Sequence, residues 1–191
     1  MKGAEAVLAK ISWLGMPSVE KFRVEKKYRA QELDGKIRSE RTKREARLLS
    51  RAKEAGVLCP VVYQVGEFFI RMKFLEGKML HHELQKRSIT AKEIGEAAKI
   101  LVALHSVDVI HGDYTPANLM ITKDGMAVID FGLGSISNDV EDKATDIVMM
   151  KKALGGKGAL FVAAYGKKGG ILSVVKMVSQ IESRARYMER G

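Results

Sequence analysis

Apolar positions follow a helical spacing most clearly in residues 89–107, whose sequence is ITAKEIGEAAKILVALHSV. The apolar residues lie three or four positions apart and so share one face of a helix: Ile94, Ala97, Ala98, Leu101 and Leu104. Thr90, with Glu93 three residues later, forms the capping-box pattern of a helix start. We therefore predict an amphipathic helix in this segment.

A second helix is predicted in residues 32–56, which are rich in strong helix formers and end at Gly56. Glu45, Leu48 and Leu49 fall on one side of it, together with Ala52. The remaining positions are strongly basic and include Lys36, Arg38, Arg41, Lys43, Arg44, Arg47, Arg51 and Lys53. A basic face is more often only solvated than functional, so the pattern leaves both interpretations open.

Shorter patterns predict strands in the first part of the chain. Residues 1–33 indicate short extended pieces with turns between them. Residues 59–74 predict two strands around Gly66, and apolar residues alternate with other residues in the second strand. We expect residues 75–78 to form a loop that leaves this strand.

The second half of the chain combines one hairpin with further helices. Residues 119–130 predict a hairpin with Asp124-Gly125 in its turn. Residues 141–154 and 171–187 predict helices. The glycine-rich sequences GGKG and GKKGG separate these helices, and we expect both to be loops.

Strands therefore dominate the first third of the chain and helices the remainder, which favours an α+β fold over alternating βαβ units. A length of 191 residues is enough for one domain with a substantial core. We place the division between an N-terminal part, residues 1–74, and a C-terminal part, residues 75–191.

The composition narrows the class of partner. The chain has 33 Lys and Arg against 23 Asp and Glu, which gives a formal net charge of +10. A balance this basic favours a polyanionic partner such as a nucleotide, a nucleic acid or an acidic protein. A lysine-rich solvated surface would give the same composition, so charge alone does not decide between them.

Cysteine content and hydropathy indicate the compartment. Cys59 is the only cysteine, so it forms no internal disulfide, and its neighbours Leu58 and Pro60 favour a buried residue over a nucleophile. The chain has no run of about 18 apolar residues that would span a membrane. The first residues, with Glu5 among them, lack the apolar core of a secretory signal. We therefore expect a cytoplasmic protein without membrane contact.

The segments HGDYTPANLM and IDFG carry the strongest chemical signal. Asp113 and Asn118 have the H-x-D-x-x-x-x-N spacing of a protein-kinase catalytic loop, and Asp130 begins D-F-G beyond the predicted hairpin. In such a site one aspartate orients or deprotonates the attacking group, while an asparagine and a second aspartate hold Mg²⁺ on the phosphates of ATP. The motif predicts the first task for Asp113 and metal binding for Asn118 and Asp130.

Residues beside these motifs are predicted to shape the loop. We expect His111 to brace it by hydrogen bonding, because this chemistry has no task for an imidazole. Phe131 is expected to pack inward, and Gly132 to allow a sharp turn. The other histidines lack the spacing of zinc ligands, and GGKGAL lacks the Ser or Thr that follows Lys in a P-loop.

A site of this kind also needs a lysine on the phosphates, held by a glutamate from a helix. Glu45 lies on the apolar side of the basic helix, where a buried carboxylate requires a cationic partner. Lys21, Lys26 and Lys27 all precede it, and periodicity does not choose among the three.

The chain resembles the small atypical kinase/ATPase subunit of the KEOPS complex, the PRPK family, in its short archaeal form. The resemblance rests on blocks in one order: KGAEA, KKYRAQELD, ERTKREARLL, HGDYTPANLM, DFGLG, EDKATDI and RARYMERG. It covers nearly the whole chain. It implies a protein-kinase-like two-lobed fold, with a small β-rich N-lobe that has one main helix and a reduced, mostly helical C-lobe.

The resemblance also implies roles for individual residues. Lys21 would be the phosphate lysine and Glu45 its partner, while Asp113 matches the catalytic base. Asn118 and Asp130 match the metal ligands. The remaining nucleotide contacts would come from Gly3, Ala4, Glu5 and Ala6 over the phosphates, from Met72 as gatekeeper, and from Lys73, Phe74 and Leu75 as the hinge that meets adenine.

The same resemblance implies cofactors and partners. The family uses ATP and Mg²⁺, phosphorylates itself in isolation and acts as an ATPase within KEOPS, where a synthase subunit makes threonylcarbamoyl-adenosine on tRNA. The basic helix, residues 36–53, and the C-terminal tail, residues 184–190, would then suit tRNA and subunit contacts. Few residues separate DFG from EDKATDI. This leaves no room for a conventional activation segment and favours water or a partner-delivered hydroxyl as acceptor.

Two alternatives compete with this interpretation. A small-molecule phosphotransferase of the aminoglycoside or choline-kinase type uses the same H-G-D-x-x-x-x-N pattern, but it carries a large helical substrate lobe for which the residues after Lys143 leave little room. A non-catalytic pseudokinase scaffold would keep the fold and lose turnover. An intact set of site residues argues against it: Lys21, Glu45, Asp113, Asn118 and Asp130.

Overall fold

The computed structural model describes residues 6–188, with side chains up to residue 185. Its N-terminal lobe is an antiparallel sheet in the order β1-β2-β4-β3. The strands are β1 (Ala6–Trp13), β2 (Met16–Arg23), β3 (Val62–Val65) and β4 (Phe69–Lys73). The extended pieces predicted within residues 6–33 and the two strands around Gly66 are therefore confirmed.

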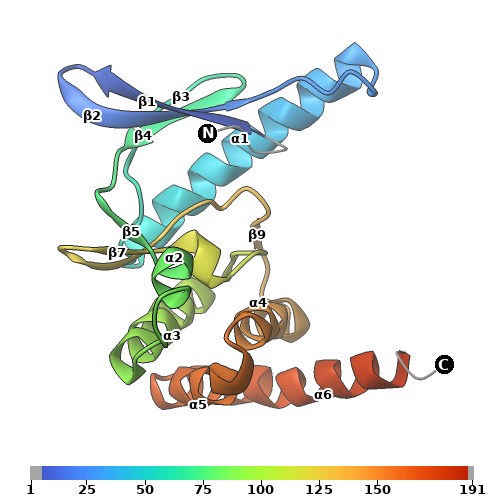
Figure 1. Cartoon of the computed structure of the whole chain (residues 1–191). Coiled ribbons are helices and arrows are strands. Elements are labelled where there is room, and N and C mark those ends of the chain that lie inside the picture. The colour runs from blue at the N-terminus through green and yellow to red at the C-terminus, as the bar shows by residue number, and fades with distance from the viewer. Residues whose placement is uncertain (1–5, 189–191) are drawn as a thin grey trace.

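Helix α1 (Gln31–Glu54) is the single long helix of this lobe and runs from the sheet towards the C-terminal lobe (Figure 1). Leu48, Leu49 and Ala52 are fully buried at its lower end, as the apolar pattern predicts. Gly56 follows the helix with a φ of +77°, a backbone angle that favours glycine and so ends the helix where expected.

The chain enters the C-terminal lobe through β5 (Gly77–Met79), α2 (Leu80–Leu84) and α3 (Ala91–Ser106). The capping box of Thr90 and Glu93 is formed at the start of α3, which confirms this prediction. The loop expected at residues 75–78 is wrong in part. Gly77 and Lys78 pair with Thr122 and Ile121, because the neighbouring hairpin offers a free edge for a short third strand.

The hairpin consists of β7 (Leu119–Thr122) and β8 (Gly125–Val128). Its turn lies one residue earlier than predicted, because Gly125 pairs with Thr122 and leaves Lys123 and Asp124 as the turn residues. Two short strands, β6 (Val109–Ile110) and β9 (Ser135–Ile136), pair with each other. In the sequence, β6 precedes the hairpin and β9 follows it. The 3-10 turn η1 (Pro116–Asn118) precedes β7.

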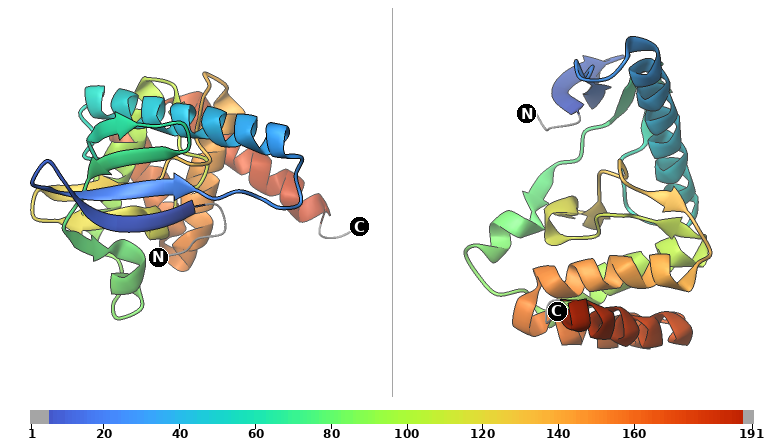
Figure 2. Two further views of the ribbon diagram at one scale, coloured as in Figure 1. Left: turned by 90° about the horizontal axis from the view of Figure 1, so that it is seen from above. Right: turned by 90° about the vertical axis from the view of Figure 1, so that its right-hand side faces the viewer.

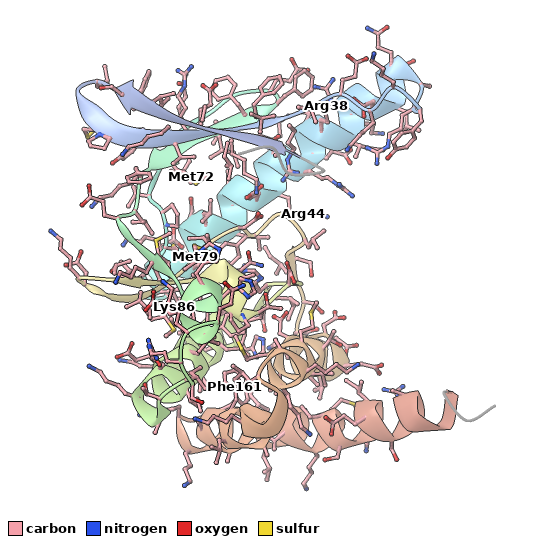
Figure 3. All side chains as sticks on the ribbon, in the orientation of Figure 1. Arg38, Arg44, Met72, Met79, Lys86 and Phe161 are labelled. Carbon is pink, nitrogen blue, oxygen red and sulfur yellow. The ribbon has the colours of Figure 1, made fainter. Side chains whose placement is uncertain are left out.

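The C-terminal helices are α4 (Val140–Ala153), α5 (Gly158–Lys167) and α6 (Leu172–Met188), which pack below the hairpin (Figure 2). The loop expected at GGKG is wrong: it forms the 3-10 turn η2 (Gly155–Lys157) and the start of α5. The loop expected at GKKGG is confirmed in part: Gly166 and Lys167 end α5, and residues 168–170 form the loop. Phe161 (Figure 3) is fully buried in the core, as is Tyr165, and their burial outweighs the low helix propensity of the flanking glycines.

One apolar core continues from α1 through the hairpin into the C-terminal helices. Cys59 belongs to it and is almost completely buried, and burial raises the pKa of its thiol to about 11. The expectation of a buried, unreactive cysteine is thereby confirmed. Among residues 6–188, no helix combines the length and the apolar character that crossing a membrane would require.

Candidate active site

A cluster of charged side chains connects the two lobes. Lys21 Nζ on β2 lies 2.7 Å from Glu45 Oε1 on α1 and 2.7 Å from Asp130 Oδ1, which follows β8. Of the three candidate lysines, the structure therefore brings Lys21 to Glu45. Lys26 and Lys27 lie in the connection between β2 and α1. Three residues that are far apart in the sequence thus meet between the sheet and the C-terminal lobe.

Arg23 is a member of this cluster that the sequence analysis missed. It lies two residues after Lys21 on the same face of β2, and its Nη2 is hydrogen bonded to Glu45 Oε2. Arg23 and Glu45 are both buried, with residue exposures of 4% and 1%. Each oxygen of this carboxylate therefore has its own cation, which meets the requirement of a buried charge for partners.

Asp130 adopts an unusual backbone conformation with a φ of +60°. The turn expected at Gly132 is present, since the Gly134 N–H donates to the carbonyl oxygen of Phe131 at 3.0 Å, but the positive φ falls on Asp130. The reason is local, because the Gly132 N–H donates to Asp130 Oδ1 at 3.0 Å. Burial raises the pKa of Asp130, but Lys21 and the Gly132 hydrogen bond outweigh it and hold the pKa below 3.8. Phe131 is fully buried, as expected.

Asp113 and Asn118 lie together on the loop between β6 and β7. The Asn118 side-chain amide donates to the carbonyl oxygen of Asp113 at 2.8 Å and to its carboxylate Oδ2 at 2.8 Å. The two side chains therefore hold each other in place. Asn118 Oδ1 and Asp130 Oδ2 are left without a hydrogen bond among the described residues. They are oxygen donors of the kind that Mg²⁺ prefers, so the site fits this ion.

His111 ties this loop to the segment that carries Asp130. Its Nε2–H donates to the carbonyl oxygen of Ile129 at 3.0 Å, and its Nδ1 accepts from the Asp113 N–H at 3.2 Å. Burial lowers the pKa of His111, and the nearby Asp146 offsets only part of this effect. A neutral ring makes both contacts, and the bracing role expected for His111 agrees with this geometry.

Asp146 on α4 is a second residue that the sequence analysis missed. Its two carboxylate oxygens accept the N–H groups of His111 at 2.7 Å and Gly112 at 2.8 Å. Gly112 has a φ of +77°, and a Cβ there would approach the carbonyl oxygen of Leu133 to 2.4 Å. Only glycine allows this tight passage, which positions the backbone just before Asp113.

Two further buried side chains extend this network into the helical lobe. His105 Nδ1 on α3 lies 2.9 Å from the hydroxyl of Tyr165 on α5, and His105 Nε2 lies 3.4 Å from Asp146 Oδ2. All three residues are at most 1% exposed. Both contacts are satisfied when Tyr165 donates to His105 and His105 donates to Asp146.

The residues expected around a nucleotide lie along the upper side of the same region. Met72 on β4 is buried beneath the sheet (Figure 3). Lys73 is exposed, while Phe74 and Leu75 are half-buried in the connection from β4 to β5. Ala6 begins β1 and pairs with Arg23. Gly3, Ala4 and Glu5 lie outside the described residues.

Four of the basic residues of α1 have two different kinds of surroundings. Arg38 is held by a 2.6 Å ion pair with the buried Asp34 and stacks on Phe68 at 3.9 Å. Three others, Lys43, Arg47 and Arg51, line a shallow groove of about 520 Å³ between α1 and β3. In the tail, Arg184 pairs with Glu141 at 2.8 Å, and the side chains from residue 186 onwards lie outside the described part.

Comparisons with known proteins were consistent with this architecture. Residues 7–147 match the RIO domain family. A probable bifunctional tRNA threonylcarbamoyladenosine biosynthesis protein from Methanobrevibacter smithii is 40% identical over 201 residues, which span 97% of this chain. The match spans only 36% of that relative, so the chain covers about a third of the length of this longer relative.

Two solved structures share the fold. The Rio2 kinase from Chaetomium thermophilum, in an ADP/Mg²⁺-phosphoaspartate complex, superposes with a TM-score of 0.66 at 14% identity and covers 98% of this chain and 70% of its own. The macrolide 2′-phosphotransferase MphH from Brachybacterium faecium gives a TM-score of 0.66 at 15% identity, with coverages of 96% and 80%. At these identities the likeness establishes the protein-kinase-like fold alone.

Proposed function

This chain belongs to the RIO domain family, and from that premise we propose that it binds ATP with Mg²⁺ and transfers or hydrolyses the γ-phosphoryl group. One observation carries the proposal. Lys21, Glu45 and Asp130 meet in one cluster, and His111 ties the loop of Asp113 to the segment that bears Asp130. This is the set of groups that phosphoryl transfer requires, in which positioning and charge stabilisation provide most of the catalysis.

Each residue has a task in this mechanism. Lys21 binds the phosphates of the nucleotide, and Glu45 holds Lys21 in place. Asn118 and Asp130 would hold Mg²⁺, which neutralises charge on the phosphates when bound. Asp113 accepts the proton of the attacking hydroxyl or orients an attacking water. The hydrogen bond from Asn118 to Oδ2 fixes the carboxylate for this task.

The nucleotide base and the phosphate cover are assigned on the same basis. We propose that Met72 borders the adenine pocket and that residues 73–75 form the hinge beside it. Gly3, Ala4, Glu5 and Ala6 cover the phosphates. The lobe boundary is placed between residues 74 and 75, in the connection between β4 and β5.

We further propose that the chain supports threonylcarbamoyl-adenosine formation on tRNA as the kinase/ATPase subunit of KEOPS. The printed name of the Methanobrevibacter relative supports this, since it describes tRNA threonylcarbamoyladenosine biosynthesis. A synthase subunit would then be the principal partner. Autophosphorylation on Ser or Thr is the activity expected of the isolated chain, and ATP hydrolysis that of the assembled complex.

The test of the catalytic proposal is Mg²⁺-ATP turnover by wild type and Asp113→Asn, with and without tRNA and the synthase partner. Removing a positioned general base costs about 10²–10⁴-fold in rate, so turnover should fall by this factor while ATP binding remains. Asp124→Asn in the hairpin turn is the matched control and should behave as wild type. Partner-stimulated phosphate release indicates an ATPase, and label retained on protein indicates a kinase. Binding without turnover in every mixture would instead establish a scaffold.

The tRNA interface is tested by the salt dependence of binding. The groove residues Lys43, Arg47 and Arg51 should bind phosphates of the tRNA, and removing one such cation lowers the slope of log K against log salt by about 0.7–0.9. The triple alanine variant of these residues should therefore bind tRNA more weakly and with a flatter salt response. An equal change in a Lys86, Lys92 and Lys99 triple alanine variant would show only a general charge effect and contradict the interface.

A further inference from the structure

We propose that Arg23 is a positioning residue that neutralises Glu45, so that the charge of Lys21 remains available to the phosphates of the nucleotide. The inference rests on the proposed ATP site. It concerns a residue that lies behind Lys21 and supports it through Glu45.

The geometry of Glu45 requires two cations. Its Oε1 binds Lys21 at 2.7 Å, and its Oε2 binds Arg23. Because Glu45 is buried, losing either partner would leave part of its charge uncompensated. Lys21 also binds Asp130, so it is shared between two carboxylates. Among the described residues, Arg23 therefore pairs with Glu45 alone, whereas Lys21 pairs with two carboxylates.

The backbone around Arg23 holds it firmly. Its N–H donates to the carbonyl oxygen of Phe68 at 2.8 Å, and its own carbonyl oxygen accepts from Arg38 Nη1 at 3.4 Å. A guanidinium stays protonated at any physiological pH. Arg23 thus provides a permanent positive charge at a fixed position behind Glu45.

The balance of charge explains what this arrangement does. Lys21 and Arg23 together match the two carboxylates of Glu45 and Asp130. Without Arg23, one lysine would face two carboxylates, and the cluster would repel an incoming polyphosphate. With Arg23 present, Lys21 can leave Asp130 for the phosphates while Glu45 stays compensated. A Cβ on Gly132 would lie 3.6 Å from both Lys21 Nζ and Arg23 Nη2, so both cations border the turn that carries Asp130.

The inference predicts an effect on nucleotide binding in the absence of metal. We would measure the Kd of ATP in EDTA and in Mg²⁺ for wild type, Arg23→Met and Arg23→Lys. At an effective dielectric constant of about 20, a unit charge about 8 Å from another changes their interaction by more than tenfold. Arg23→Met should therefore weaken binding in EDTA about tenfold or more, and Arg23→Lys should keep most of the affinity.

Two further variants separate this role from a loss of structure. Arg71 pairs with Glu20 on the same sheet at 2.7 Å, so Arg71→Met is a matched control that should leave the Kd unchanged. In the double variant Arg23→Met with Glu45→Gln, the uncompensated carboxylate is gone while an amide oxygen can still accept from Lys21, so the affinity in EDTA should recover part of the loss seen in Arg23→Met. A structural defect would instead make the double variant as weak as the single variant, or weaker.

The outcomes are distinct. If wild type bound ATP in neither EDTA nor Mg²⁺, the proposed function itself would be refuted. Wild-type binding that disappears completely in EDTA, an Arg23→Met variant with unchanged Kd, or a double variant that stays weak would each overturn the role of Arg23 and leave the ATP site standing.

Discussion

The candidate site is built from two buried polar networks that differ in kind. On the N-terminal side, Lys21, Arg23 and Glu45 form a network of full charges joined to Asp130. On the C-terminal side, Asp146 binds backbone N–H groups and His105, and His105 binds Tyr165, so this network centres on one carboxyl group that contacts backbone and side-chain hydrogen-bonding groups.

The two networks also differ in their access to solvent. The side chain of Asp130 is 48% exposed, so the charged network reaches solvent at this residue. Asp146, His105 and Tyr165 are closed off from solvent. The difference indicates a division of labour. The C-terminal network fixes the backbone before Asp113 in advance, whereas the N-terminal network holds charges that can exchange partners when a nucleotide enters.

The largest expected effect on stability comes from breaking the charged network. Glu45→Gln leaves Lys21 and Arg23 as buried cations without their carboxylate, and removing one partner of a buried ion pair costs about 3–5 kcal/mol. Urea unfolding would measure this loss. Glu20→Gln removes the half-exposed partner of Arg71 and should cost at most about 1 kcal/mol. Equal losses of stability in both variants would contradict the larger contribution expected of the charged network.

Breaking the C-terminal network at its centre should have the next largest effect. Asp146→Asn places an amide against the N–H groups of His111 and Gly112, and a hydrogen bond to a charged group is worth about 1.5–3 kcal/mol. Turnover should fall as well, because the loop before Asp113 loses its anchor, while ATP binding should change little. Thr145→Ala on the exposed side of α4 is the control. Weakened ATP binding with unchanged turnover would contradict the role of the C-terminal network in fixing the loop before Asp113.

The outer end of that network should matter less. Tyr165→Phe removes the hydroxyl that binds His105 and should lower the free energy of unfolding by about 1 kcal/mol. Thermal or urea unfolding would measure it, with the exposed Tyr28→Phe as control. If Tyr165→Phe lowered turnover as strongly as Asp146→Asn, control of the loop would extend to α5, and the network would be a single unit.

The smallest effect concerns pH. The pKa of His111 is lower in the folded chain than its ordinary value of 6.5. Between the pKa of His111 in the folded chain and that in the unfolded chain, the unfolded chain therefore binds more protons. The free energy of unfolding should decrease as pH falls below about 6.5. His111→Gln should flatten this dependence in urea titrations between pH 5 and 8. A dependence that is unchanged in the variant would assign the effect to another group.

The regular elements of the fold were largely predictable from local pattern. The capping box of Thr90 and Glu93, the stop at Gly56 and the two strands around Gly66 are encoded within a few residues, because each depends on backbone preference and apolar period. The prediction was wrong where long-range packing decided the structure. Helix α5 forms in a glycine-flanked segment because Phe161 and Tyr165 are buried by other helices.

The sequence by itself therefore determined the α+β class, the long basic helix and the order of Asp113, Asn118 and Asp130, since spacing along the chain carries that information. It contained weaker signals for the missed residues: Arg23 alternates with Lys21 on a strand, and Asp146 stands among apolar positions of a helix. Local pattern left three lysines open as the partner of Glu45, and only the resemblance pointed to Lys21; tertiary structure alone decided which second cation completes the charge of Glu45. Those contacts join residues more than 20 positions apart, and only the packing of sheet, helix and hairpin brings them within hydrogen-bonding distance.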